Sequence, residues 1–109
     1  MPSAQHLHTW QNDHEDLAFL LASKGDPARA AGEFSKLSRT FLNRADYALY
    51  AGAAYVASGH QAEAAPYFLA ASRQLGDSVV RRAGASLVKE ARMRAKAIAE
   101  SSQPNHSPR

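Results

Sequence analysis

The sequence has no cysteine, one tryptophan and no long apolar run. Without cysteine, the chain can hold no disulfide framework, no zinc–thiolate site and no cysteine nucleophile. Its apolar stretches are all shorter than the roughly 18 residues that a membrane-spanning helix needs. The first residues also lack the basic region and apolar run of a secretory signal. We therefore expect a cytoplasmic protein with no membrane span.

The 109 residues are enough for one small domain, and 45% of them are hydrophobic. Many of these are alanine, so we expect a thin core of closely spaced helices. The net charge of +3 conceals an uneven distribution. Residues 1–78 carry six Lys/Arg against eight Asp/Glu, whereas residues 79–109 carry seven against two. The C-terminal part of the chain is therefore basic and the rest is slightly acidic.

An internal repeat is the strongest pattern in the sequence. Gly25 and Gly59 lie 34 residues apart, and each interrupts a run with helical periodicity. Shifting the chain by that interval aligns further identical residues: Ala28 with Ala62, Ala30 with Ala64, Ala31 with Ala65, Phe34 with Phe68, Ser38 with Ser72, and Arg39 with Arg73. Small residues beside bulky ones at helical spacing are typical of closely packed helices. The sequence therefore predicts two copies of one helical hairpin.

Residues 45–78 resemble one unit of the tetratricopeptide repeat family, whose period is also 34 residues. They carry its pattern of small, aromatic and turn residues: Gly52, Tyr55, Gly59, Ala64, Phe68 and Ala71. Residues 11–44 resemble it less closely, because Leu21 replaces the aromatic residue and Leu37 the small one. The proline that usually follows the second helix is absent from both units. The resemblance covers about two thirds of the chain; the alternative is an unrelated alanine-rich hairpin duplicated by chance.

The resemblance implies an all-α fold with five helices, an α–α superhelix of two tandem helix-turn-helix repeats and a long capping helix. Asn12 followed by Glu15 is a capping-box pattern and predicts that the first helix begins there. Trp10 is expected to close the N-terminal end of the core. The expected segments are a flexible N-terminus (1–10), the domain (11–100) with its repeats (11–44 and 45–78) and capping helix (79–100), and a disordered tail (101–109).

Stacked hairpins form a shallow superhelix whose concave face is lined by the first helix of each hairpin. The resemblance implies that this face is lined by Glu15, Phe19, Ala22, Asp46, Leu49, Tyr50, Ala53, Val56 and, from the capping helix, Leu87. Much of it is apolar, which predicts a groove for an amphipathic helix or extended peptide of a partner. Its rim is acidic, with Asp13 and Asp16 beside Glu15 and Asp46, and favours a basic or neutral ligand.

The chain itself is an alternative occupant of this face. Residues 79–100 could fold across it, as could the N-terminal segment with Trp10, and a second copy could cover it in a homodimer. Exposed apolar patches on monomers are usually small, which favours some form of coverage. The sequence leaves these alternatives open.

The capping helix carries six of the 13 Lys/Arg residues: Arg81, Arg82, Lys89, Arg92, Arg94 and Lys96. Such a helix could contact the phosphates of a nucleic acid or another anionic surface. It has no aromatic residues for stacking on bases, and the repeats that precede it are acidic. We therefore expect these side chains to be solvated, and a nucleic-acid contact is the alternative function.

No catalytic or cofactor site is expected. His6, His8 and His14 have a weak metal-ligand spacing without a supporting scaffold, so we predict no metal site. The scattered His, Asp and Glu residues suggest no arrangement of nucleophile, base and orienting group, so we predict that the protein is not an enzyme.

The sequence therefore predicts a protein-binding adaptor or chaperone that holds a segment of a partner in the concave groove. Small chaperones of bacterial type III secretion systems are similar in size, fold and groove character. That resemblance implies a cytoplasmic protein that holds an apolar helix of a needle or translocator subunit.

Overall fold

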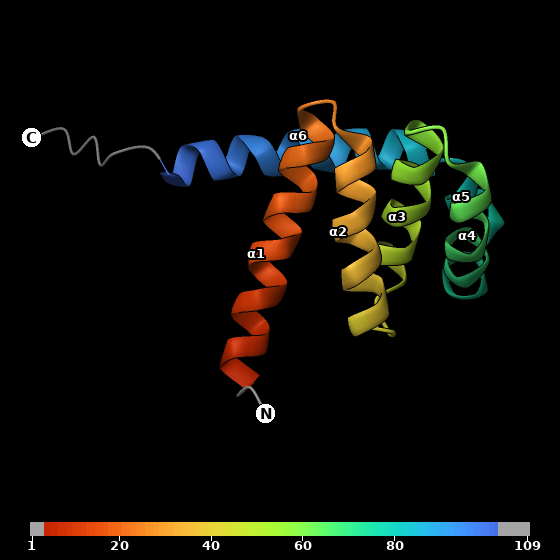
Figure 1. Cartoon of the computed structure of the whole chain (residues 1–109), viewed down its shortest axis with the longest axis horizontal. Helices are drawn as coiled ribbons and strands as arrows, with labels where there is room; N and C mark the ends of the chain where they lie inside the picture. Colours follow the sequence, from red (N-terminus) through yellow and green to blue (C-terminus); the bar gives the residue numbers. More distant parts are fainter. Residues whose placement is uncertain (1–3, 103–109) are drawn as a thin grey trace, which may run out of the picture.

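The structure is a computed structural model that describes residues 4–102 of the chain. All regular structure in these residues is helical, which confirms the all-α fold (Figure 1). This part of the chain forms six helices rather than the expected five. They are α1 (Ala4–Ser23), α2 (Pro27–Thr40), α3 (Ala45–Ala57), α4 (Gln61–Leu75), α5 (Asp77–Arg81) and α6 (Ala83–Ser102).

The turns inside the two hairpins have the same backbone geometry. Gly25 ends α1 with a φ of 79°, and Gly59 ends α3 with a φ of 84°. In both turns the N–H of the following residue donates to the carbonyl five positions earlier, at 2.9 Å for Asp26 and 2.8 Å for His60. This bond and the left-handed glycine define the same helix-ending motif at both sites. The sequence repeat is therefore a repeat of local structure.

The helices that follow these turns begin differently. The side chain of Asp26 accepts a hydrogen bond from the backbone N–H of Arg29 at 3.3 Å, and Pro27 occupies the first turn of α2. α4 begins after His60, whose side chain makes no capping bond to the helix. The imidazole of His60 instead lies 2.9 Å from the hydroxyl of Ser58. The first hairpin thus has the better capped second helix.

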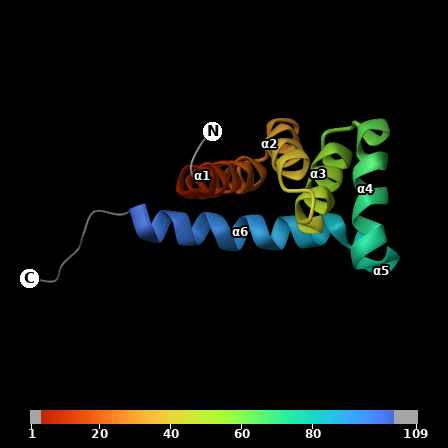
Figure 2. The same ribbon diagram turned by 90° about the horizontal axis from the view of Figure 1, so that it is seen from below.

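The four repeat helices stand side by side, and α6 crosses them on one side (Figures 1 and 2). α2 lies between α1 and α3, and α4 packs on α3 at the end of the row. α6 runs back from that end and packs on α3 and α1, the first helices of the two hairpins. The C-terminal helix therefore covers the side of the row formed by α1 and α3, which is the face expected to be concave.

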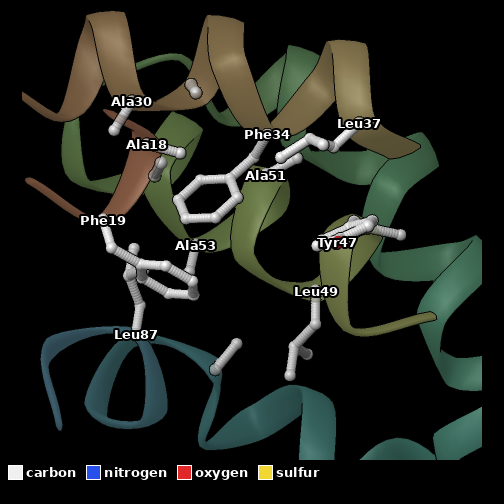
Figure 3. Close-up of a cluster of buried hydrophobic side chains, with 14 of the residues drawn as sticks. Ala18, Phe19, Ala30, Phe34, Leu37, Tyr47, Leu49, Ala51, Ala53 and Leu87 are labelled. Carbon is white, nitrogen blue, oxygen red and sulfur yellow. The ribbon is translucent and has the colours of Figure 1, made fainter. Parts of the chain in front are cut away.

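The core is built around three rings from different helices. Phe34 of α2 has its ring centroid 5.0 Å from Phe19 of α1 and 5.6 Å from Tyr50 of α3, and the latter two rings are 5.5 Å apart. Alanines such as Ala18, Ala30 and Ala51 fill the space around them and are fully buried (Figure 3). These small residues let the helix backbones approach closely, as the composition predicts.

α3 and α4 come into close contact at a glycine. A Cβ atom built on Gly52 would lie 2.6 Å from Cε1 of Phe68, closer than any carbon contact in a relaxed structure. The ring of Phe68 therefore occupies the space that a side chain at position 52 would need. The small residue recognised there in the sequence is a packing requirement.

The N-terminal boundary of the fold differs from the prediction. α1 begins at Ala4, so residues 4–10 are helical, and the expected helix start at Asn12 is wrong. Within α1 the amide of Asn12 lies 3.3 Å from the His8 ring instead of capping a helix. The ring of Trp10 lies 4.2 Å from that of His14, tilted by 40°, and 6.2 Å from the ring of Phe41, the residue that follows α2. These ring contacts give the additional N-terminal turns a surface to pack on.

The long C-terminal helix is interrupted. The expected helix over residues 79–100 is instead the short α5 and the long α6, with a one-residue break at Arg82. The N–H of Arg82 bonds back to the carbonyl of Val79 at 3.1 Å, which closes α5. The break lets the chain turn from the end of the row onto the concave side. Helix α6 reaches Ser102, and the remainder of the expected tail lies outside the described residues.

Candidate functional site

The predicted groove residues lie between the hairpins and α6. Phe19, Leu49, Ala53 and Leu87 each have at most 5% of their surface exposed. Figure 3 shows Leu87 of α6 against Phe19, with Ala53 beside them and Leu49 directed toward α6. The structure therefore brings these four residues together as part of the core.

The groove is not open in this structure, contrary to the main prediction. α6 fills it, so the alternative in which residues 79–100 cover the face is the one observed. Ala22 and Tyr50 are partly buried at its margin. Val56 is 41% exposed and does not join the buried group. The physical reason is that the break at Arg82 directs the apolar side of α6 onto α1 and α3.

The acidic rim is paired with a cation from α6. The guanidinium of Arg94 lies 2.6 Å from a carboxylate oxygen of Glu15 and 2.9 Å from one of Asp16. It also lies 5.1 Å from the centre of the Phe19 ring, within range of a cation–π interaction. Burial alone would lower the pKa of Arg94, but its hydrogen bonds to the two carboxylates outweigh burial and raise it. A basic group thus occupies the acidic end of the face, and it belongs to the chain itself.

Glu15 is the centre of a wider polar network. Its side chain is only 13% exposed and accepts a hydrogen bond from the hydroxyl of Tyr47. The same hydroxyl accepts a bond from the amide of Gln11 at 2.9 Å, and Arg44 lies 3.7 Å from Glu15. The hydrogen bond from Tyr47 and the ion pairs with Arg44 and Arg94 thus compensate for the burial of this carboxylate.

Two tyrosines beside this network titrate abnormally. Burial raises the pKa of Tyr47 to about 12, with a further contribution from its hydrogen bond to Glu15. Burial also raises the pKa of Tyr50 to about 12, and the negative charges of Glu90 and Asp46 add to the effect. Both phenols therefore stay protonated at neutral pH and act as hydrogen-bonding or packing groups rather than as bases.

Asp46 does not line the occupied part of the face. Its carboxylate forms a two-point ion pair with Arg44, at 3.0 and 2.8 Å, and one oxygen accepts from the backbone N–H of Tyr47. Asp46 thus supports the first turn of α3. It holds Arg44 over the Tyr47 ring, 4.3 Å from the ring centre.

The basic residues of the C-terminal segment divide into two groups. Arg94 is turned inward, whereas the others are exposed: Arg81, Arg82, Lys89, Arg92 and Lys96. Arg94 lies seven positions after Leu87, so helical geometry places both on the same side of α6. That spacing is the signal that could have separated Arg94 from the solvated cations. Nothing comparable in the sequence points to Gln11, Arg44 or Tyr47.

In the part of the chain that the structure describes, no cluster of three His, Asp or Glu residues could hold a metal ion. His14 is engaged with Glu33 of α2, at 2.5 Å between ring nitrogen and carboxylate oxygen. His6 and His8 lie on α1, where residues two positions apart point to different sides. The described helices also include none that is both long and apolar enough to cross a membrane.

The surface of the described residues includes the following two hollows. One, of about 330 Å³, lies where α6 leaves α1 and is lined by Ala22, Ser23, Val88, Ala91, Arg92 and Ala95. The other, of about 340 Å³, is mostly apolar and is lined by His6, Leu7, Trp10 and Thr40. The first lies between the C-terminal end of α1 and α6. Trp10 thus forms one wall of the second, at the N-terminal end of the row.

Comparison with known proteins gives no relative for this arrangement. No protein family matches the chain, and no curated protein or solved structure matches it either. The functional argument therefore depends on the geometry of the concave face and of α6.

Proposed function

We propose that the chain is a non-enzymatic protein-binding module of the tetratricopeptide type, and that its concave face takes an amphipathic helix of a partner in place of α6. One observation carries this proposal: the face already holds an amphipathic helix. α6 supplies apolar side chains at the centre of the contact and a single cation at its acidic end. A helix from another protein with the same pattern would meet the same surface.

The spacing of the buried and charged residues on α6 indicates which residues a partner helix needs. Ala83, Leu87 and Ala91 are its buried residues, spaced by four positions along one side of the helix. Arg94 follows on that side and meets Glu15 and Asp16. A replacing helix therefore needs small or branched apolar residues at intervals of three or four. It also needs a basic residue after them, since a carboxylate left without its cation loses its main compensation for burial.

Competition with α6 sets the conditions for binding. A tethered segment has an effective concentration in the millimolar range, so a partner must bind the face considerably more tightly than α6 does. This requirement suits a chaperone that protects one dedicated apolar helix from water. A cytoplasmic chaperone of type III secretion subunits, as the resemblance implies, is the more specific form of the proposal.

A peptide with the sequence of residues 83–102 tests this function on the full-length protein. We expect weak binding of the labelled peptide to the wild type, because α6 competes for the same face. Binding should tighten by at least about fivefold in Arg94→Ala, which weakens the hold of α6 and leaves Glu15 and Asp16 available. Fluorescence anisotropy at constant ionic strength measures both affinities.

The matched control is Arg92→Ala, which removes an exposed cation of the same helix and should leave the affinity unchanged. A peptide in which the residue equivalent to Arg94 is alanine should not bind the Arg94→Ala protein more tightly than the wild type. Circular dichroism establishes that each variant is folded. Absence of peptide binding to folded Arg94→Ala would reject exchange at the concave face.

The exposed side of α6 supports an alternative function. Lys89, Arg92 and Lys96 are all exposed and follow one another at intervals of three and four positions, so they form one basic row. Such a row could contact phosphates of a nucleic acid. In that case binding of a labelled oligonucleotide should weaken steeply with salt, and replacing the three residues by alanine should remove that dependence. Binding that is unaffected by the triple variant would reject this alternative.

A further inference from the structure

The outer side of α4 is an apolar surface that no other described helix covers. α4 stands at the end of the row, with α3 on one side and no element on its outer side (Figures 1 and 2). We call its exposed apolar residues the end face: Ala62, Ala65, Pro66, Leu69 and Ala70. Leu69 alone has 55% of its surface exposed. Terminal helices of repeat arrays normally present a polar outer side, so this end of the row lacks the usual protection.

Comparison of α4 with its counterpart in the first hairpin, α2, shows how the end face differs. Ala31 and Ser35 of α2 are buried, with 0% and 3% of their surface exposed. Their counterparts 34 positions later are Ala65 and Leu69 of α4, and both are exposed. α2 has a helix on each side, α1 and α3, whereas α4 has only α3 and the short α5. At Ala65 and Leu69 the end face is therefore a surface that the neighbouring helices cover in the first hairpin, whereas the counterparts of Ala62 and Ala70 are exposed in α2 as well.

The aromatic residue at the equivalent place shows the same difference. Phe34 is fully buried, while Phe68, which fits against Gly52, is only partly buried. Another helix on the end face would cover this exposed ring margin as α3 covers that of Phe34. The surface thus fits an occupant of helical shape with small contact residues.

Two charged residues of α4 indicate which helix could dock on the end face. Glu63 and Arg73 are exposed and lie near opposite ends of α4; helical geometry places Arg73 on the end face beside Leu69, and Glu63 about 80° away at its edge. Neither forms a hydrogen bond or ion pair with any residue of the described range 4–102. If a second α4 lies antiparallel to the first, Glu63 of each copy meets Arg73 of the other. The end face is therefore complementary to itself in charge and in shape.

The other end of the row does not offer a matching surface. The exposed surface of α1 is mixed: it includes the polar residues Asn12, Asp13 and Lys24 as well as Leu17, which is 38% exposed. Head-to-tail stacking would place these polar groups on Leu69 and Ala65 and leave them without partners. Pairing of like ends about a two-fold axis closes the assembly at two copies instead of forming a filament.

We propose that the end face docks a second copy of this chain, α4 against α4 in antiparallel orientation about a two-fold axis. The contact leaves the concave face and α6 free, so it does not depend on the binding function proposed above. A helix of 15 residues is about 22 Å long, and two such helices bury less surface than a standard stable interface. The dimer is therefore weak and depends on protein concentration.

Sedimentation velocity over a range of protein concentrations tests the proposal on the full-length chain. The wild type should shift from monomer to dimer as concentration rises toward about 1 mM, the weak end of specific association. Leu69→Glu places a carboxylate at the centre of the contact from both copies and should weaken the dimer at least about 100-fold. The control is Leu42→Glu, at a leucine that is 79% exposed in the turn before α3. It should behave as the wild type.

A charge exchange tests the antiparallel pairing itself. Glu63→Arg and Arg73→Glu each create two like-charge contacts across the axis and should each weaken the dimer about tenfold. The double variant restores opposite charges and should recover the wild-type affinity. All these residues are exposed, and circular dichroism confirms that the variants fold. A wild type that stays monomeric, equal effects of Leu69→Glu and Leu42→Glu, or a double variant without recovery would each overturn the proposal.

Discussion

The two hairpins share a turn but are held together by different interactions. In the first, His14 of α1 is bonded to Glu33 of α2, and Arg94 joins α1 to α6 through two carboxylates. The second relies on shape, because Phe68 fits against Gly52 and the rings of Tyr55 and Tyr67 stack at 5.6 Å. One repeated backbone motif thus supports a first hairpin that adds ion pairs to its Phe19–Phe34 packing and a second that relies on packing. The first should respond to pH and salt, and the second to changes of side-chain volume.

Removing the ring that joins the two hairpins should have the largest effect. Phe34 is fully buried and contacts both Phe19 and Tyr50. Phe34→Ala leaves a cavity between α1 and α3 and should lower the free energy of unfolding by about 3–5 kcal/mol. Urea denaturation followed by circular dichroism measures this change. Phe34→Leu retains most of the volume and should cost clearly less; equal losses would contradict a packing role for the ring.

A methyl group added to α3 should destabilise the second hairpin. Gly52→Ala forces the ring of Phe68 to move and should cost about 1–3 kcal/mol of stability. Gly32→Ala in α2 is the matched control, since a Cβ there has no neighbour within 4 Å. It should stabilise the protein by about 0.5–1 kcal/mol, the usual gain for alanine within a helix. Thermal or urea unfolding would contradict the comparison if both variants changed stability in the same direction.

The polar contact between α1 and α6 should contribute less to folding stability than the packing contacts above. Arg94→Ala leaves Glu15 partly buried with fewer partners and should cost about 1–2 kcal/mol, between the values for exposed and buried pairs. Arg92→Ala removes an exposed cation nearby and should change stability by less than about 0.5 kcal/mol. The Arg94 effect should also shrink at 1 M salt, where charges are screened within about 3 Å. Equal effects of the two variants would show that the ion pairs do not hold α6.

Lowering the pH should have the smallest of these effects on folding stability, through Glu33. Burial alone would raise the pKa of Glu33, but hydrogen bonds from His14 and Lys36 and their charges outweigh it and lower the pKa below 4.5. Because the folded-state pKa is depressed, the stabilisation is complete above the unfolded value of about 4.3 and disappears as pH falls through the folded value. The wild type should therefore lose more stability than Glu33→Gln below about pH 4.5. Parallel pH profiles of the two proteins would exclude this contribution.

The local features of the fold could be predicted from the sequence. The spacing of Gly25 and Gly59 locates both turns, because each glycine has the left-handed conformation that ends a helix. The small residue at Gly52 likewise anticipates close helix packing. These features depend on short stretches of chain, where residue type and backbone geometry are directly linked.

The start of α1 and the break at Arg82 depend on contacts between distant segments. Asn12 and Glu15 have the spacing of a helix start, but the ring contact between Trp10 and Phe41 favours further turns before them. At Arg82 there is neither glycine nor proline to signal an interruption. The break is required only because α6 must return across α3 and α1. Such requirements become visible only once the hairpins are stacked.

The candidate site also depends on contacts between distant segments that the sequence does not reveal. The tetratricopeptide resemblance grouped Phe19, Leu49 and Ala53 on one face, and the structure places them together. It could not show that Leu87 arrives there with the whole of α6 and closes the face. The side of a helix can be read from periodicity, whereas its neighbour is decided by the relative stability of the available contacts.

The order of α6 in the chain has a consequence for biosynthesis. The cover of the concave face is translated after both hairpins, and at about 5–20 residues per second its 20 residues take roughly 1–4 s to synthesise. During that interval the hairpins can already have stacked while Phe19, Leu49 and Ala53 still face water. A nascent chain on a polysome would therefore pass through a brief period in which another polypeptide meets this surface without competition.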